Sequence, residues 1–283
     1  MSSFSDDWLA LREPYDARAR NAKVLAAVAA SFEQNDTIQI VDLGCGTGST
    51  MRALSPLLAA RQKWRLVDND TELLAKAMAA RPLECVAATA VALDLNRDLE
   101  AALDGPINLV TTSALLDLVS EKWLERLAMK VAARSIPFYA ALSYDGRIEL
   151  TPVDPFDTAI TAAVNAHQRT DKSFGPALGS AAAAIAITLF QSHSYALVQG
   201  ASDWVISSDD CKMQSEVLAG WAKAAAGTSG LTAADASAWL TRRRDAVDAK
   251  ISSIRVGHID VFAVPMRTRR AEKSQSNKTS SSI

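Results

Sequence analysis

Short apolar runs alternate with helix-like stretches along the first half of the chain. Runs rich in valine, isoleucine and leucine that end at glycine or acidic residues are typical of buried strands, and apolar residues three or four apart predict helices between them. The runs are residues 38–43, 64–70, 85–96, 107–114 and 137–145, and the helical stretches are 47–62, 71–82 and 121–134. This alternation predicts an α/β fold with a doubly wound, mostly parallel sheet.

The pattern changes after residue 145. Helices are predicted at 154–168, 181–193, 211–226 and 232–253, and two more strands, which make seven in all, at 195–207 and 258–265. A helical segment at 8–32, broken near Pro14, precedes the first strand. We therefore expect an N-terminal helical lid (1–35), a core (36–150), the rest of the core sheet with helical cap insertions (151–265), and a disordered polar tail (266–283).

Composition narrows the class of protein. The 283 residues carry 30 Lys and Arg against 32 Asp and Glu, a formal net charge of −2, so no basic field favours nucleic acid. Three cysteines without a C-x-x-C pair favour a reducing compartment over a disulfide framework. No signal pattern is visible, and the longest alanine-rich run, 179–190, is too short to span a bilayer. We predict a cytoplasmic protein with no membrane partner, and no residue spacing predicts a metal.

Candidate chemistry gathers where the predicted strands end. Asp42 ends the first strand, just before Gly44, Gly46 and Gly48, and Asp68 and Asp94 end the next two. Ligands of open α/β sheets bind at the carboxyl ends of strands, so these acids should share one site. Three carboxylates repel a phosphate. They suit a ligand with a cationic amine, ribose hydroxyls and an adenine amino group.

Two other classes of nucleotide-binding site also have glycines directly after the first strand. A phosphate-binding Walker loop is excluded, since no Gly-Lys-Ser/Thr follows. A nicotinamide-dependent dehydrogenase stays open as an alternative, because Asp68 lies near the position of its ribose-binding acid. Its third glycine, however, would fall at Ser49, and it has little use for Asp94. Taken singly, Asp68 or Asp94 also fits a helix N-cap.

The segments "VDLGCGTGS", "LVDND", "ALDLN" and "LVTTSALLDLV", in this order, resemble the motif series of class I S-adenosylmethionine-dependent methyltransferases, which have a Rossmann-like fold. The resemblance covers residues 42–118 and implies S-adenosylmethionine as cofactor. It implies that Asp42 holds the methionine part and Asp68 the ribose, and that Asp94 binds the adenine amino group. The remaining cofactor-binding positions that it implies are Gly44, Cys45, Gly46, Gly48, Asn69, Leu95, Thr111 and Ser113.

The acceptor side is predicted from three segments. Asp117 follows the fourth strand, either as an acceptor-contacting catalytic group or as an exposed acid that caps the next helix. The segment 165–179 gathers His167, a candidate general base, with Arg169 and Lys172, candidate substrate-binding groups; a solvated surface loop is the alternative. In the first helix, Arg18 or Arg20 is a candidate partner for a carboxylate of cofactor or acceptor, and Arg18 is chosen as the substrate-binding residue; a solvated basic face is the alternative.

The acceptor class follows from what is missing. The Asn/Asp-Pro-Pro-Tyr signature of enzymes that methylate amino groups of bases or glutamine is replaced by "TTSA" after the fourth strand. We therefore expect methyl transfer to an O or N atom of a small metabolite. The helices between 211 and 253 are interpreted as a cap or homodimer surface. We interpret Trp204, Trp221 and Trp239 as core, and His193 and His258 as structural. A NAD(P)-dependent oxidoreductase and a non-catalytic cofactor-binding protein remain alternatives.

Overall fold

The computed structural model describes residues 5–79, 83–226 and 230–266. Its strands are β1 (Thr37–Leu43), β2 (Arg61–Asp68), β3 (Val86–Ala92), β4 (Leu109–Ser113), β5 (Phe138–Thr151), β6 (Tyr195–Ala201), β7 (Trp204–Ile206) and β8 (Ser253–Pro265). Its helices are α1 (Asp6–Ala19), α2 (Ala22–Ala30), α3 (Ser49–Leu54), α4 (Thr71–Ala79), α5 (Leu99–Ala102), α6 (Glu121–Ala133), α7 (Asp157–Gln168), α8 (Ala182–Ser192), α9 (Cys211–Ala225) and α10 (Ala233–Asp248), with single 3₁₀ turns at Ser55–Leu57 and Gly179–Ala181.

One sheet organises the molecule, with the strand order β3-β2-β1-β4-β5-β8-β6. Strands β1 to β5 pair in parallel, and β8 lies antiparallel between β5 and β6. Strand order reverses between β1 and β4, which is where such sheets bind ligands. The doubly wound, mostly parallel α/β fold is confirmed. The expected seven strands become eight in the described chain, because residues 195–207 form β6 and the short β7.

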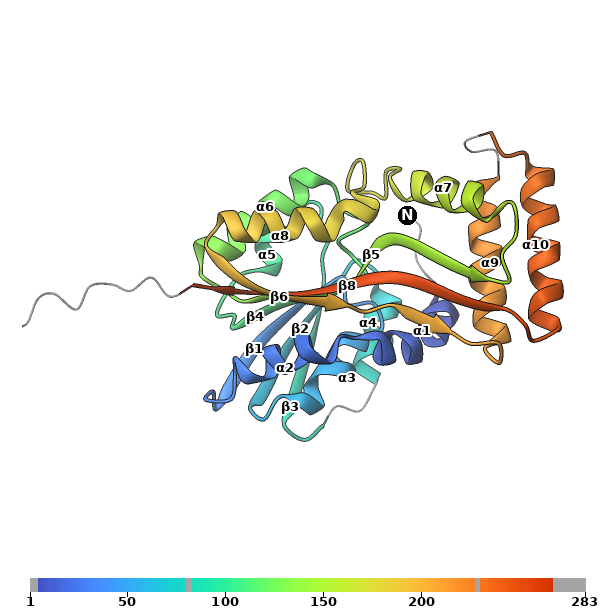
Figure 1. The fold of residues 1–283 in the computed structure, drawn as a ribbon. Coiled ribbons are helices and arrows are strands. Elements are labelled where there is room, and N and C mark those ends of the chain that lie inside the picture. Colours follow the sequence, from blue (N-terminus) through green and yellow to red (C-terminus); the bar gives the residue numbers. More distant parts are fainter. Residues whose placement is uncertain (1–4, 80–82, 227–229, 267–283) are drawn as a thin grey trace, which may run out of the picture.

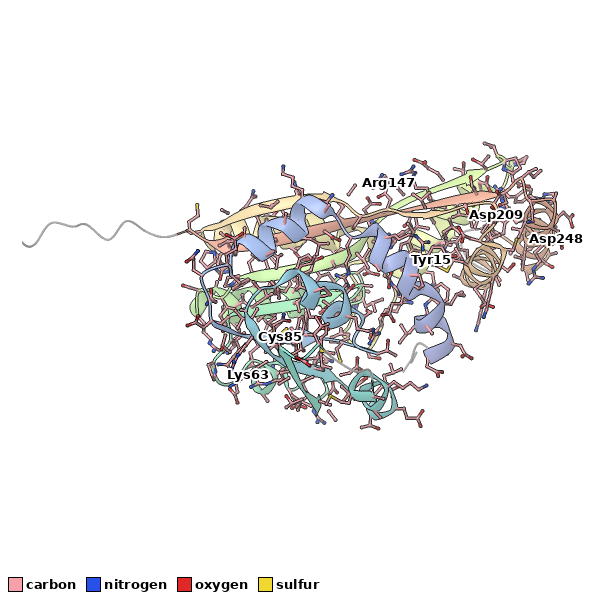
Figure 2. The ribbon with its side chains drawn as sticks, turned by 90° about the horizontal axis from the view of Figure 1, so that it is seen from below. Tyr15, Lys63, Cys85, Arg147, Asp209 and Asp248 are labelled. Carbon is pink, nitrogen blue, oxygen red and sulfur yellow. The ribbon has the colours of Figure 1, made fainter. Side chains whose placement is uncertain are left out.

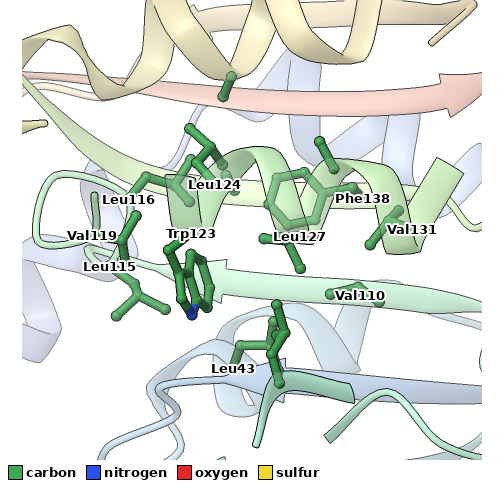
Figure 3. Close-up of a cluster of buried hydrophobic side chains, with 14 of the residues drawn as sticks. Leu43, Val110, Leu115, Leu116, Val119, Trp123, Leu124, Leu127, Val131 and Phe138 are labelled. Atoms are coloured by element: carbon green, nitrogen blue, oxygen red, sulfur yellow. The ribbon is translucent and has the colours of Figure 1, made fainter. Parts of the chain in front are cut away.

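Helices cover both faces of the sheet, as Figure 1 shows. Helices α2, α3 and α4 pack on one face through a cluster that includes Val28, Leu54 and Leu74. Helices α5, α6 and α8 pack on the other. Figure 3 shows this second cluster, in which Trp123 and Leu127 of α6 face the strands. The amphipathic pattern of "EKWLERLAMKVAA" thus places its apolar side on the sheet and its charges in water.

Strands β5 and β8 are much longer than β1 to β4 and extend the sheet beyond its core. Their paired extension joins the core to a cap made of α7, α9, α10 and β7 (Figure 1). In Figure 2, Lys63 and Cys85 lie at the core end, whereas Asp209 and Asp248 lie at the cap end. The cap has its own buried cluster, centred on Trp239 and Met213.

Local differences from the predictions have simple causes. The first helix does not break at Pro14, which lies inside α1; it ends at Arg20, and Asn21 caps α2 by accepting from the N–H groups of Lys23 and Val24. Helix α3 is shorter than predicted because a 3₁₀ turn containing Pro56 follows it. The predicted helix end near Pro82 and nearly all of the predicted disordered tail lie outside the described residues.

Candidate functional site

A cavity of about 680 Å³ lies at the carboxyl ends of β1 to β4. We call it the glycine-loop cavity, because Gly44 and Gly46, in the loop between β1 and α3, form part of its wall. Predicted residues from five separate segments meet here. They are Gly44, Cys45, Gly46, Asp68, Asn69, Asp94, Leu95, Ser113 and Lys172. The topology thus brings together most of the cofactor-side positions that the motif resemblance implied.

The glycine loop requires its glycines for conformational reasons. Gly44, Gly46 and Gly48 all have positive φ angles, of 66°, 52° and 82°, which side chains disfavour. A Cβ at Gly44 would also lie only 3.3 Å from the Leu115 side chain. The Gly46 N–H donates to Asp68 Oδ2 at 2.8 Å, which ties the loop to the end of β2. The backbone therefore approaches the cavity closely, as the sequence pattern predicted.

Asp42 lies beneath this loop and is fully buried. Neither of its carboxylate oxygens has a hydrogen-bond partner among the described residues. Burial raises its pKa to about 8, although the Arg20 charge acts to lower it. A buried carboxylate without a partner is costly, so this position favours a ligand or water that donates hydrogen bonds.

Arg20 occupies the neighbouring buried position, at the end of α1. It donates to the Tyr139 hydroxyl at 3.2 Å and to Thr50 Oγ1 at 3.3 Å, and its Nε has no partner in the described part of the chain. Its longest contact, at 3.4 Å, reaches Ser113 Oγ. Arg18, the residue chosen from sequence, is instead exposed and lies over the Tyr15 ring at 4.5 Å, away from the cavity lining.

The other acids of the cavity have distinct partners. Asp68 Oδ1 accepts from the Asp70 N–H, while Asp70 caps α4 by accepting from the N–H groups of Glu72 and Leu73. The N-cap interpretation of Asp68 is therefore wrong, because Asp70 has that role. Asp94 is exposed at the cavity edge, and its Oδ1 accepts from the Asn96 N–H.

Three predicted cofactor positions lie behind the wall of this cavity. Thr111 is fully buried and pairs in register with Asp42 across β1 and β4. Gly48 begins α3, in contact range of Ala77. Asp42 itself is covered by the loop. These three residues would therefore affect a bound ligand indirectly, by fixing the conformation of the glycine loop and the position of the Asp42 carboxyl group.

A second cavity, of about 470 Å³, adjoins the first. We call it the aromatic cavity, after Trp8, Tyr144, Trp204 and Trp221 in its wall. The remaining side chains that define it are Arg12, Ala114, Asp117, Leu118, Leu142, His167, Gln168, Lys172, Glu216, Val217, Ala224, Val256 and His258, with Gly220. The two cavities share Arg12, Ala114, Leu118 and Lys172, so these four residues form the partition between them.

Asp117 lies in the wall of the aromatic cavity. It is 7% exposed, and its Oδ1 is buried without a hydrogen-bond partner among the described residues. Burial raises its pKa to about 6. The alternative interpretation, an exposed acid that caps α6, is wrong: Ser120 is the N-cap, accepting from the Trp123 N–H.

The other predicted acceptor-side residues divide between the cavities and the surface. His167 lines the aromatic cavity, and burial together with Lys172 lowers its pKa. Lys172 lies in the partition, its Nζ donating to Thr170 Oγ1 at 3.0 Å. Arg169 is exposed, and neither cavity lining includes it.

Sequence reasoning missed the aromatic walls. Trp204 and Trp221, interpreted as core, line this cavity, as does His258, interpreted as structural; Trp239 is fully buried as expected. Trp8 and Tyr144 were not singled out at all. All five of these residues are buried or half-buried, so hydrophobic pattern alone does not separate a cavity wall from a core. Only the packing of α1 against β7, which brings Trp8 to Trp204, reveals the difference.

Comparisons with known proteins bear mainly on architecture. No family model and no curated protein matches the chain. Solved structures do match, among them YcgJ from Bacillus subtilis, at 16% identity and a TM-score of 0.47, covering 88% of this chain and all of that one. The cyclopropane synthase MmaA2 from Mycobacterium tuberculosis matches at 9% identity and 0.48, covering 92% and 94%. An S-adenosylmethionine-dependent methyltransferase from Geobacter sulfurreducens, solved with S-adenosylhomocysteine, matches at 14% and 0.42, covering 94% and 100%.

The fold itself is settled by the strand order. Strands β1 to β5 are parallel and wind outward from β1, and the antiparallel β8 lies between β5 and β6. It is a Rossmann-like fold of the methyltransferase type. The matched structures, at these identities and TM-scores, carry no argument for what this chain binds or transfers. That has to come from the two cavities.

Proposed function

We propose that this protein is an S-adenosylmethionine-dependent methyltransferase that acts on a small molecule. The observation that supports this most is the pair of adjoining cavities. One lies at the switch point of the sheet, between a glycine loop and the acids at the ends of β2 and β3. The other begins across a partition of four residues. A transferase that joins two ligands needs such a pair, because it must hold donor and acceptor in line.

The chemistry of the first cavity fits the proposed donor. Asp42 and Arg20 lie outside the cavity lining, where two Asp42 oxygens and the Arg20 Nε are buried without partners among the described residues. In this proposal Asp42 acts across the glycine loop on the ammonium of a methionine group, and Arg20 acts on its carboxylate. Asp68, held by the Gly46 N–H, keeps lone pairs for ribose hydroxyls. Asp94, exposed at the cavity edge, would accept a hydrogen bond from an adenine amino group. The cofactor, when bound, would supply a sulfonium methyl carbon whose bonding pair stays on sulfur as the acceptor lone pair attacks.

Calorimetry with S-adenosylhomocysteine tests the proposal. We expect binding, and Asp68→Ala should weaken it by about 1–3 kcal/mol, the range for losing hydrogen bonds to a charged group. The matched control is Asp104→Asn. It changes an exposed acid before the amino end of β4, whereas the cavity lies at the carboxyl ends of the strands. Its affinity should equal that of the unmodified protein.

Binding of NAD(P)H with no binding of S-adenosylhomocysteine would overturn the proposal in favour of an oxidoreductase. A non-catalytic protein would bind S-adenosylhomocysteine normally and transfer no methyl group. A screen of small-metabolite mixtures with labelled S-adenosylmethionine separates that case, since it reads transfer rather than binding. The acceptor atom, O or N, is the finer question, and the aromatic cavity bears on it.

A further inference from the structure

The aromatic cavity has an ordered wall of rings. The Trp8 and Trp204 ring centroids lie 6.3 Å apart, Trp204 and His258 5.1 Å apart, and His258 and Tyr144 6.1 Å apart. These four rings come from α1, β7, β8 and β5, and α9 adds Trp221. Rings in edge and tilted contact hold one another in place and present fixed faces and edges to a ligand.

Three of these rings turn a polar atom to the protein. Trp204 Nε1 donates to Asp16 Oδ1 at 2.9 Å, and the Tyr144 hydroxyl donates to Asn165 Oδ1 at 2.9 Å. The His258 Nδ1 bonds to the Val256 carbonyl at 3.1 Å. What remains for a ligand in the cavity is therefore mainly apolar ring surface.

The basic groups around the cavity are paired or neutral, whereas acidic groups remain available. Arg12 is paired with Asp16 through two hydrogen bonds, of 2.9 and 3.2 Å. Burial lowers the pKa values of His167 and His258, the latter to about 4, so His258 is neutral at pH 7. Lys172, in the partition, bonds to a hydroxyl. Against these, the buried Asp117 Oδ1 has no partner in the described chain, and Glu216 adds an exposed carboxylate.

An unpartnered buried carboxylate beside aromatic rings is the surrounding that ammonium groups favour, through charge-assisted hydrogen bonds and cation–π attraction. We propose that the aromatic cavity binds the methyl acceptor, and that this acceptor is an amine on an aromatic or apolar body. Asp117 holds the ammonium group, and Trp8 and Trp221 contact the body. This inference rests on the methyltransferase proposal and narrows its acceptor atom to nitrogen.

The chemistry requires one proton to move. An ammonium group has no lone pair, so it must first give a proton to a base; Asp117 is the group placed to take it. The neutral amine then forms the new N–C bond, while the electron pair of the broken C–S bond stays on sulfur. The methylated ammonium carries the positive charge that the sulfonium loses, so charge balances.

The test uses three ligands that share a phenylethyl body: phenethylamine, 2-phenylethanol and 3-phenylpropionate. Calorimetry and tryptophan fluorescence on the unmodified protein, without methyl donor, should rank them amine, alcohol, acid. Asp117→Asn should weaken the affinity for phenethylamine by about tenfold or more, the scale of a charged hydrogen bond. The affinity for 2-phenylethanol should stay within about twofold. Glu216→Gln, at an exposed position, should have a smaller effect on the amine.

Two further variants separate specific effects from general ones. Trp221→Leu should weaken the binding of the amine and of the alcohol equally, because both lose contact with the Trp221 ring. Glu125→Gln removes an exposed carboxylate on α6, outside both cavity linings, and should change neither. Melting curves and S-adenosylhomocysteine binding show whether each variant is folded.

The outcomes distinguish the two proposals. Equal affinity for amine and alcohol, or tightest binding of 3-phenylpropionate, would overturn the amine inference; the second result would assign the cavity to acids held by Lys172. If S-adenosylhomocysteine still binds in that case, the methyltransferase proposal stands. If the amine binds through Asp117 but S-adenosylhomocysteine does not bind, the methyltransferase proposal falls and the cavity remains an amine site.

Discussion

The two cavities lie on either side of a thin partition, yet they are built in opposite ways. The glycine-loop cavity takes most of its wall from short segments at successive strand ends, with backbone N–H groups and carboxylates that hold each other in place. The aromatic cavity takes most of its wall from α1, β5, α7, β7, α9 and β8, and rings from four of these elements contact one another. The first depends on loop conformation, and the second depends on how the cap sits on the extended strands.

The largest expected effect concerns the cap. Arg243 is only 2% exposed, donates to the Pro152 carbonyl and pairs with Asp157, which also accepts from Trp239 Nε1 at 2.9 Å. Arg243→Ala leaves the Asp157 charge without this partner and should lower the free energy of unfolding by about 3–5 kcal/mol. Urea denaturation measures it, with the exposed neighbour Arg244→Ala as control.

The same variant sharpens the comparison between the cavities. Under conditions where Arg243→Ala remains folded, phenethylamine binding should weaken more than S-adenosylhomocysteine binding, because the cap borders only the aromatic cavity. An equal loss of both would contradict the separation of the two sites.

Acid should act on the aromatic cavity through His258. Burial lowers its pKa from its usual 6.5 to about 4. Between those values the unfolded chain binds more protons than the native protein, so this contribution to stability is complete above pH 6.5 and is lost as the pH falls towards 4. The loss reaches about 3 kcal/mol at most. His258→Phe should therefore lose less stability between pH 7 and pH 4.5 than the unmodified protein.

The control for that measurement is His193→Gln, which changes an exposed histidine after α8. It should follow the unmodified protein at both pH values. Asp117 has a pKa raised to about 6, so its contribution to stability grows as the pH falls below 6, opposite to that of His258. The effect of His258 is therefore read from the difference between the two histidine variants, in which Asp117 is unchanged.

The smallest expected effect concerns the contact between α1 and the glycine loop. Arg52 pairs with Glu13 at 2.6 and 2.7 Å and donates to the Thr47 carbonyl at 2.6 Å. Because both side chains are about a third exposed, Glu13→Gln should cost about 0.2–1 kcal/mol. It should speed S-adenosylhomocysteine dissociation measured by stopped flow, and high salt should reduce the difference. Exposed Glu33→Gln should have no effect.

The sequence allowed the sheet and the glycine loop to be predicted because their signals are local. Three glycines and an acid within seven residues, followed by acids at the next two strand ends, need only parallel topology to become one site. The loop conformation also follows from residue type, since positive φ angles favour glycine.

The aromatic cavity could not be predicted in this way. Trp8 and His258 are 250 positions apart in the chain, and their meeting with Trp204 depends on the long pairing of β5 with β8. The periodicity of either segment indicates only that one side is covered by protein. The choice of Arg18 over Arg20 failed to identify the buried arginine for a related reason: both lie near the end of α1, and the turn at Asn21 decides which one points inward.

Helix α1 supplies wall to both cavities at once, with Leu9 and Asp16 in the first, Trp8 in the second and Arg12 in both. A ligand that restricts the motion of this helix changes the free energy of binding at the neighbouring site. Such linkage is reciprocal, so whatever factor the donor product contributes to amine affinity, the amine contributes to donor-product affinity. A single helix can thus make the binding of two ligands cooperative, although the two need not touch.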